Sequence, residues 1–194
     1  SLLGVNGLAP VQLGTKKVSI NGAQRVVSQY GIGVVNTGAA RKRAPSPVME
    51  ITYTGFPSTT LPMMCETYEV KNITGRTITV IVPEFVQKAK TDPEKGVDGS
   101  YIIQAEIYGN GTFKIEPGKS IEFGAAFQAY REKNEKALTP DVKAEYAKRM
   151  AYVKNSIDGS LVLETPEKVI DTEFRFAKIR ASESIYRTKG GLMH

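Results

Sequence analysis

The sequence predicts a mainly β protein, an antiparallel β-sandwich followed by two C-terminal helices. Residues 48–130 contain about six segments that alternate apolar and polar side chains or are dominated by β-branched residues. Short turns containing Gly, Pro or Asn separate these segments. After residue 133 the pattern changes to two stretches with helical spacing, each preceded by Thr-Pro. Closely spaced strands with turn chemistry between them are typical of an antiparallel sandwich.

The first 46 residues are rich in Gly, Asn and Ala, and only short strands are predicted there, at Val18–Ile20 and Gly31–Val35. We expect this segment to wrap along other structure and to end in a basic loop at Arg41–Arg43. Its run GIGVVNTG lacks the glycine spacing of dinucleotide-binding and phosphate-binding loops. Nucleotide binding is therefore not predicted.

Alternating side chains predict strands at Val48–Thr54 and Met63–Asn72, and a β-branched run predicts the next at Thr77–Phe85, where Pro83 ends regular pairing. The short turn NITGR joins the second and third of these, so we expect them to form an antiparallel hairpin. The remaining predicted strands of the sandwich are Tyr101–Tyr108, Phe113–Ile115 and Ser120–Tyr130.

The first helix is predicted within residues 139–160, with Thr139 as its cap and Gly159 just beyond its end. It carries one apolar stripe, formed by Val142, Tyr146, Met150 and Val153. A short strand, Ser160–Glu164, is predicted to follow it.

The second helix is predicted to begin at Thr165, which can cap it, with Pro166 in the first turn. Its apolar residues fall on two stripes on roughly opposite sides. The first stripe contains Ile170, Phe174, Ala177, Ala181 and Ile185, and the second contains Val169, Phe176, Ile179 and Tyr186. A helix on a small domain needs one apolar face, so we expect the second stripe to be exposed or covered by another partner, such as a second copy of the chain.

The composition is that of a globular protein without an evident nucleic-acid or membrane partner. The chain has 194 residues, a net charge of +6 and a pI near 9.3. Apart from Arg41–Arg43 the basic residues are interspersed with acidic ones, which favours a mixed solvated surface. No apolar run approaches the length of a membrane-spanning helix, and the first residues lack the basic region of a signal peptide.

Candidate chemistry is sparse. The single cysteine, Cys65, lies in an apolar run and is predicted to be a buried, inert thiol. The single histidine, His194, is the last residue, so neither a histidine-based triad nor a multi-histidine metal site is predicted, and no cofactor is expected. Alternation is expected to place the strand carboxylates Glu66 and Glu122 on the solvent face, and no carboxylate is predicted to be catalytic. The full set of candidates is Glu66, Glu69, Glu106, Glu122, Asp171 and Glu173.

Two further patterns have a structural interpretation beside a functional one. Asn72 and Asn110 each begin an N-x-S/T glycosylation pattern, but both lie at predicted turns, which favour Asn for backbone reasons. Strand aromatics could form a sugar-stacking platform, although half-buried packing is the commoner role. These aromatics are Tyr30, Tyr53, Phe56, Tyr68, Tyr101, Tyr108 and Tyr130.

The end of the chain resembles a known enzyme family. The segment LVLETPEKVIDTEFRFAKIRASESIYRTKGGLMH is similar to the junction in bacterial glycoside hydrolases of the six-hairpin, (α/α)6-barrel type. There a helix opened by a T-P-D/E cap carries a pattern like F-x-F-A-K-x-R-A-x-E-S, which matches Phe174 to Ser184 here. The resemblance implies a supersandwich (galactose-mutarotase-like) domain at 1–133, a linker helix and strand at 134–164, and the first helix of a missing barrel at 165–194.

The resemblance also implies a function. The chain would be a non-catalytic N-terminal portion that braces the barrel and walls the sugar cleft, with the catalytic carboxylates downstream of His194 and an oligo- or polysaccharide bound by the complete enzyme. It implies contacts to substrate from Lys189 to His194 and a periplasmic or extracellular location, while a lone cysteine fits the cytoplasm equally. The alternatives are a free-standing binding module for a polysaccharide or protein, and an oligomeric surface or virion protein.

Overall fold

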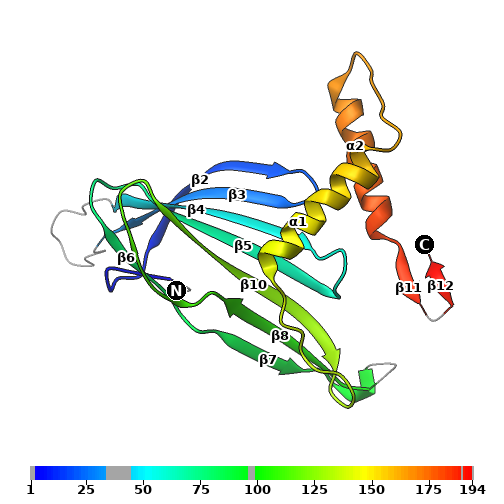
Figure 1. Cartoon of the computed structure of the whole chain (residues 1–194), viewed down its shortest axis with the longest axis horizontal. Helices are drawn as coiled ribbons and strands as arrows, with labels where there is room; N and C mark the ends of the chain where they lie inside the picture. Colours follow the sequence, from blue (N-terminus) through cyan, green and yellow to red (C-terminus); the bar gives the residue numbers. More distant parts are fainter. Residues whose placement is uncertain (1–2, 34–44, 96–98, 189, 194) are drawn as a thin grey trace.

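The computed structural model describes residues 3–33, 45–95, 99–188 and 190–193, and it confirms the predicted fold class. Two antiparallel sheets form a sandwich, and two helices follow it (Figure 1). The larger sheet has the strand order β2 (Val11–Ile20), β3 (Gln24–Ile32), β4 (Ser46–Pro57), β5 (Met63–Asn72), β10 (Ser120–Arg131), β8 (Tyr101–Tyr108), β7 (Val86–Lys90). The smaller sheet has the order β1 (Gly4–Val5), β6 (Ile78–Val82), β9 (Gly111–Ile115).

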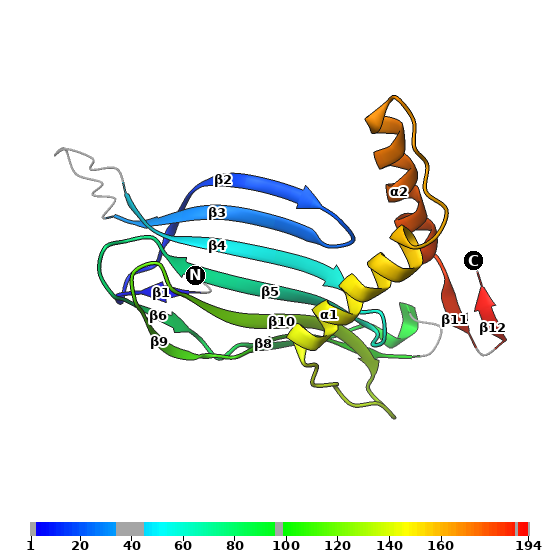
Figure 2. The ribbon, with the colours of Figure 1, turned by 45° about the horizontal axis from the view of Figure 1, so that its top comes forward.

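The main core lies between the two sheets. Every second residue along the strands of the larger sheet faces the smaller sheet, as expected for an antiparallel sheet with one buried face. Each fully buried aliphatic side chain there contributes roughly 1.5–3 kcal/mol to folding. The smaller sheet covers only one end of this face, at the left of Figure 2. The buried members of the core are Leu3, Val5, Met49, Ile51, Val70, Ile78, Val80, Val82, Ile115 and Phe123.

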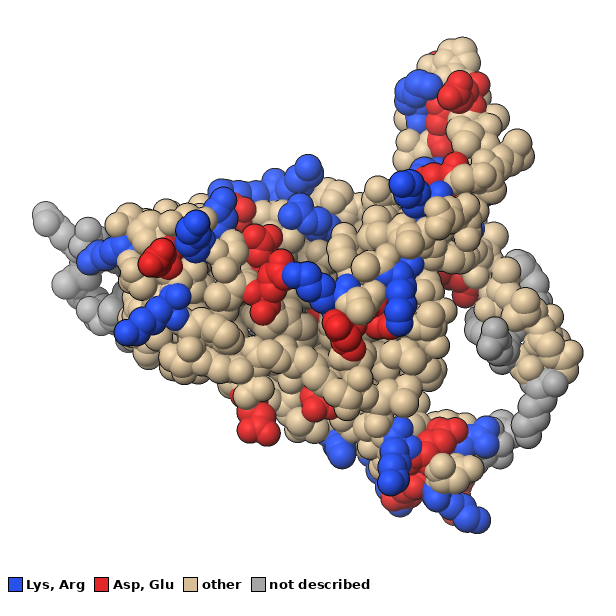
Figure 3. Space-filling view, in the orientation of Figure 1, with Lys and Arg blue, Asp and Glu red and all other residues tan. Residues whose placement is uncertain are grey.

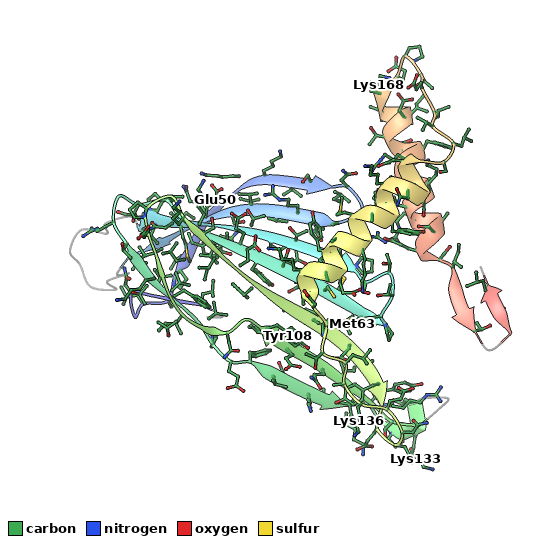
Figure 4. All side chains as sticks on the ribbon, in the orientation of Figure 1. Glu50, Met63, Tyr108, Lys133, Lys136 and Lys168 are labelled. Atoms are coloured by element: carbon green, nitrogen blue, oxygen red, sulfur yellow. The ribbon has the colours of Figure 1, made fainter. Side chains whose placement is uncertain are left out.

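The opposite face of the large sheet carries α1 (Val142–Tyr152), which continues as a π-helical turn, Val153–Asp158. Under the helix lies a second cluster built on Phe56, Cys65 and Ala126. A Cβ atom at Gly124 would lie 2.9 Å from the Val142 side chain, so the glycine allows the helix to approach β10 closely. In Figure 4, Met63 and Tyr108 lie near the first turn of α1.

The second helix, α2 (Lys168–Glu183), projects away from the sandwich and is followed by a small hairpin of β11 (Tyr186–Thr188) and β12 (Gly191–Met193) (Figures 1 and 2). Lys168, at the start of α2, lies at the tip farthest from the sheet (Figure 4). One α2 side chain, Ile179, is buried, in a small cluster with Val153 and Ile157. Across the described residues, the helix therefore meets the rest of the molecule through the end of α1.

The predicted hairpin between β5 and β6 is wrong. The two strands follow one another in sequence but belong to different sheets, β5 pairing with β4 and β10 and β6 with β1 and β9. Asn72 stabilises this crossing, because its fully buried side-chain amide donates to the carbonyl oxygens of Arg76 and Ile115, each at 2.8 Å. A buried side chain with both amide hydrogens bonded cannot accept a glycan, so Asn72 has the structural role.

Residues 11–32 form two full strands of the large sheet, which corrects the expectation of a segment that wraps along other structure. β2 pairs with β3 through two bulges, so its alternation is broken and the sequence pattern is weak. The basic loop Arg41–Arg43 and the residues 34 and 35 of the second predicted strand lie outside the described residues.

The helix starts also differ from the prediction. Asp141, rather than Thr139, caps α1 by accepting from the backbone N–H of Ala144 at 3.0 Å. α2 begins at Lys168, so Thr165 does not cap it. The Thr165 hydroxyl donates a hydrogen bond to the Asp171 carboxylate in the first turn, whereas a capping threonine would accept one from a backbone N–H of that turn. The predicted strand at 160–164 is irregular chain, and it pairs with none of the strands in the described residues.

Candidate functional site

A cleft of about 720 Å³ occupies the part of the large sheet that the smaller sheet leaves uncovered. Its lining includes Gln12 of β2 and Gln87 of β7, which lie on the two edge strands. Since both edges of a seven-stranded sheet contribute to one cavity, the sheet curves around it. We refer to this cavity as the concave cleft.

A carboxylate held by two tyrosines lies in the concave cleft. The Tyr68 hydroxyl donates to one oxygen of Glu66 at 2.6 Å, and the Tyr53 hydroxyl donates to the other at 3.2 Å. Tyr53 and Tyr68 face one another across β4 and β5, where they are register partners. Glu66 lies two residues before Tyr68 on the same face of β5, which is why all three side chains meet.

The surroundings keep both tyrosines protonated. Burial, followed by the nearby Glu66 charge, raises the pKa of Tyr53 to about 12. Burial and the hydrogen bond to Glu66 also raise the pKa of Tyr68 well above its ordinary value. Both hydroxyls therefore remain donors at physiological pH, and Glu66 is their acceptor.

Aromatic rings continue along the floor of the cleft. The rings of Tyr68 and Phe123 stack with centroids 4.8 Å apart and planes 6° from parallel. The Tyr53 ring lies 5.6 Å from that of Tyr68 at an angle of 60°. Phe127 lies four residues after Phe123 on the same face of β10, lines the cleft and is 42% exposed. The cleft thus offers an accessible aromatic surface beside a fixed carboxylate.

The charge of the concave cleft is negative. The Glu66 carboxylate lies in it, and no Lys or Arg lines it within the described part of the chain. The Glu106 carboxylate instead accepts from Gln104 and Tyr108 on the opposite face of the sheet. Neutral polar groups lie toward the β2 edge, where the Gln12 side-chain amide donates to the Ser28 hydroxyl at 3.1 Å. Elsewhere, charges of both signs are mixed over the face seen in Figure 3, as the interspersed sequence pattern predicts.

A second cavity, of about 510 Å³, lies on the opposite face beside the start of α1. Its lining includes Thr52, Thr54 and Glu69 from the sheet. Lys143 of α1 reaches Glu122 of β10 across its rim at 2.8 Å, with both side chains mostly exposed. This cavity is a gap beside the helix that is lined by both polar residues and aromatic ones, the latter including Tyr108 and Tyr146.

Two buried charges hold α1 in place. The Glu145 carboxylate, 3% exposed, accepts from the hydroxyls of Ser58 at 2.5 Å and Thr60 at 2.9 Å, and from Lys148 at 2.5 Å. Burial alone would raise the pKa of Glu145, but these hydrogen bonds outweigh it and leave the pKa below its ordinary value. The carboxylate is saturated with partners, so its role is to fasten α1 to the loop after β4.

Arg149, also 3% exposed, fastens the other end of α1. Its Nε donates to the carbonyl oxygen of Gly22 at 2.7 Å, and its Nη2 lies 2.5 Å from Glu183 of α2. Arg149 therefore connects the β2–β3 turn, α1 and α2.

Polar contacts carry most of the attachment of α2. Arg175 forms two hydrogen bonds with Asp158, at 2.6 and 3.0 Å, and this pairing lowers the pKa of Asp158. Lys178 donates to the carbonyl oxygens of Ile157 and Leu161 at 2.5 and 2.6 Å. The contacting face of α2 lies between the two apolar stripes, so each stripe is left largely in solvent.

Ile179 was predicted to lie on an exposed stripe, and this is wrong, since it is 4% exposed. Other members of both stripes are exposed: Val169 is 69%, Ile170 48% and Phe176 46% accessible to solvent. The side chain of Tyr186 lies outside what the structure describes. The apolar surface without a partner is thus larger than predicted and belongs to both stripes.

The carboxylates considered from sequence do not come together as a catalytic pair. Glu66 was expected on the solvent face and instead lies in the concave cleft, because its face of β5 is the one the smaller sheet only half covers. Glu106 accepts from Gln104 and Tyr108, and Asp171 pairs with Lys168 at the start of α2. The predicted substrate-loop contacts Lys189 and His194 lie outside the described residues.

The predicted aromatic platform is divided between the two faces of the sheet. Tyr30, Tyr53 and Tyr68 line the concave cleft, whereas Tyr108 lines the second cavity and Phe56 is buried beneath α1. Sequence reasoning missed Phe85 and Phe127 as cleft residues. The alternation of β10, which places Phe123, Ala125 and Phe127 on one face, was the signal that could have identified Phe127.

Cys65 is fully buried, which confirms its predicted burial, and burial raises the pKa of its thiol to about 11. Among the described residues, no group of His, Cys, Asp and Glu side chains is arranged to hold a metal ion. Within the same residues, no helix combines the length and apolar character needed to cross a membrane.

Comparison of the sequence with protein-family models and with curated proteins finds no match.

Proposed function

We propose that the chain is the non-catalytic N-terminal portion of a carbohydrate-active enzyme of the glycoside hydrolase class. In this proposal the β-sandwich braces an (α/α)6 barrel whose first helix is α2. The observation that carries the proposal is the exposure of Val169, Ile170 and Phe176 on a helix that touches the rest of the chain on one polar face. A barrel helix packs on both neighbours, and this distribution of apolar residues suits it.

The total surface supports the same proposal. The chain exposes 12949 Å², whereas a compact monomer of 21.2 kDa exposes roughly 9,100 Å². The projecting α2 and the hairpin after it contribute to this excess. Burying exposed apolar groups stabilises an assembly by roughly 25 cal/mol per Å², so further helices packed on α2 would gain a substantial free energy.

The coding region beyond codon 194 provides the direct test. We expect an open frame that continues with several hundred residues of helical periodicity, containing an acid and a base for glycoside hydrolysis. A stop codon immediately after codon 194 would contradict the proposal.

The free chain provides a physical test through its association state. We expect the 194-residue chain to self-associate in sedimentation experiments and the double variant Val169→Ser/Phe176→Ser to be monomeric, because exposed apolar patches drive association. The matched control, Val18→Ser/Ile103→Ser, removes similarly exposed apolar side chains from the sandwich and should associate like the wild type. Identical sedimentation of the wild type and the α2 variant would count against the proposal.

A further inference from the structure

We propose that the concave cleft binds a neutral, hydroxyl-rich ligand, an oligosaccharide whose ring packs on Phe127 and whose hydroxyl groups donate to Glu66. The cleft lies on the sheet face opposite α1, and none of its lining residues belongs to α2. The inference therefore stands whether or not further helices pack on α2.

The size and lining of the cleft suit a small ligand. Ligand sites are concave cavities of roughly 300–1,000 Å³ with mostly apolar walls and a few placed polar groups, and this one measures about 720 Å³. Phe127 is 42% exposed within this concavity, whereas Phe123, on the same strand and face, is 8% exposed. Phe127 thus presents an accessible ring on which the apolar C–H face of a sugar can pack.

Glu66 has the geometry of an acceptor for ligand hydroxyls. A carboxylate offers about four lone-pair sites, and the hydroxyls of Tyr53 and Tyr68 occupy one on each oxygen. The two tyrosines fix the carboxylate in the cleft and leave lone pairs on both oxygens for a ligand. Charge-assisted hydrogen bonds of this kind are about twice as strong as neutral ones.

The charge of the cleft selects against other ligand classes. Glu66 repels anions, and no Lys or Arg among the described lining residues would neutralise a fatty-acid carboxylate or a phosphate. A quaternary ammonium ion would be attracted by Glu66, but it has no hydrogen-bonding group that could bind the side-chain amides of Gln12 and Gln87 or the hydroxyl of Ser28. Neutral hydroxyl groups use all of these as hydrogen-bond partners.

The test is a binding titration of the full 194-residue chain, measured by NMR and calorimetry. The ligands are four neutral tetrasaccharides: maltotetraose, cellotetraose, xylotetraose and mannotetraose. We expect at least one to bind with a dissociation constant on the order of 1 mM or below. Glu66→Gln, which removes the charge and places an amide hydrogen against a tyrosine donor, should weaken binding roughly 10-fold. Phe127→Ala should weaken it by a similar factor, and this exposed site tolerates truncation without unfolding.

Two matched variants serve as controls. Glu122→Gln changes an exposed carboxylate on the opposite face, and Ile81→Ala truncates a side chain that is 41% exposed on the smaller sheet. Both should bind like the wild type. Absence of binding by all four tetrasaccharides at 10-fold higher concentration would overturn the proposal, as would unchanged binding in Glu66→Gln and Phe127→Ala. Perturbation of the cleft by tetramethylammonium or dodecanoate, with no response to the sugars, would overturn it in favour of another ligand class.

Discussion

The helices α1 and α2 follow the same Thr-Pro sequence signal but are held in the molecule in opposite ways. α1 lies on the sheet, with Val142 buried at its start and the charged Glu145 and Arg149 buried along it. α2 buries Ile179 and is otherwise fastened by polar contacts, among them the pair between its half-buried Glu183 and the buried Arg149. The comparison shows that an apolar stripe predicts the need for a partner without identifying it.

The partner surface explains the difference. α1 meets a broad sheet face on which Gly124 leaves room for Val142, so apolar contact extends along the helix. α2 meets the end of α1, where its Glu183 pairs with Arg149, and the π-helical turn, whose carbonyl groups accept from side chains such as Lys178.

Replacing Arg149 with Ala should have the largest effect. The substitution leaves the Gly22 carbonyl without its donor and Glu183 without its main partner, and breaking a buried ion pair costs about 3 kcal/mol or more. Denaturant unfolding should show this loss. Lys143→Ala is the control, since its pair with Glu122 is exposed and contributes little to stability. Equal effects of the two substitutions would mean that the Arg149 contacts do not stabilise the fold.

Replacing Gly22 with Ala should cost about 2 kcal/mol in the same measurement. Gly22 has a φ of +75°, which disfavours any side chain, and the new Cβ would lie 2.3 Å from a methyl carbon of Val153. Gly75→Ala, at a site with open space around the new Cβ, should be close to neutral. If Gly22→Ala were also neutral, α1 would not be packed tightly against the β2–β3 turn.

Acid should weaken the attachment of α1 through Glu145, by less than the loss in Arg149→Ala. The pKa of Glu145 is lower in the folded chain than in the unfolded one. Its contribution is therefore complete above the unfolded pKa of about 4.3 and is lost as the pH falls through the folded pKa. Unfolding followed between pH 7 and pH 2 should show a shallower acid limb in Glu145→Gln than in the wild type. Glu122→Gln should keep the steeper wild-type limb, and a wild-type limb in Glu145→Gln would exclude this role.

Replacing Ile179 with Ser should have the smallest effect on global stability, below about 0.5 kcal/mol, because α2 opens locally without unfolding the sandwich. Hydrogen exchange should nevertheless show lost protection for Lys168–Glu183, since the substitution removes the buried contact with Val153 and Ile157. Phe176→Ser, at an exposed position on the same helix, should change neither quantity. A large loss of global stability in Ile179→Ser would place α2 in the same cooperative unit as α1.

Several elements of the fold were accessible from local patterns. The strands β5, β8 and β10 agree with the predicted segments because each is half-buried, so alternation marks the buried face directly. β2 was largely missed because it is an exposed edge strand with two bulges, and no apolar face distinguishes it. The pairing of β6 was mispredicted because a short turn favours a hairpin, and sheet membership depends on the remote partner β9.

The concave cleft could be predicted only in part. The alternation of β5 places Glu66 and Tyr68 on one face, but whether that face is covered or open depends on the short extent of the smaller sheet. Glu145 and Arg149 gave no signal at all, since charged residues at helical spacing normally face solvent. Their burial follows from partners 87 and 127 residues away in the sequence.

Local patterns in the sequence were sufficient to predict the fold class, the two helices, the buried Cys65 and the excess of apolar surface at the C-terminal end. These properties depend on local periodicity and on side-chain chemistry, which are present in any short window of sequence. The three-dimensional arrangement was needed to show which face of α2 is attached, which charged groups are buried, and that Glu66, Tyr53 and Phe127 line one cleft. These properties depend on strand order and sheet curvature, which bring together groups that no local pattern connects.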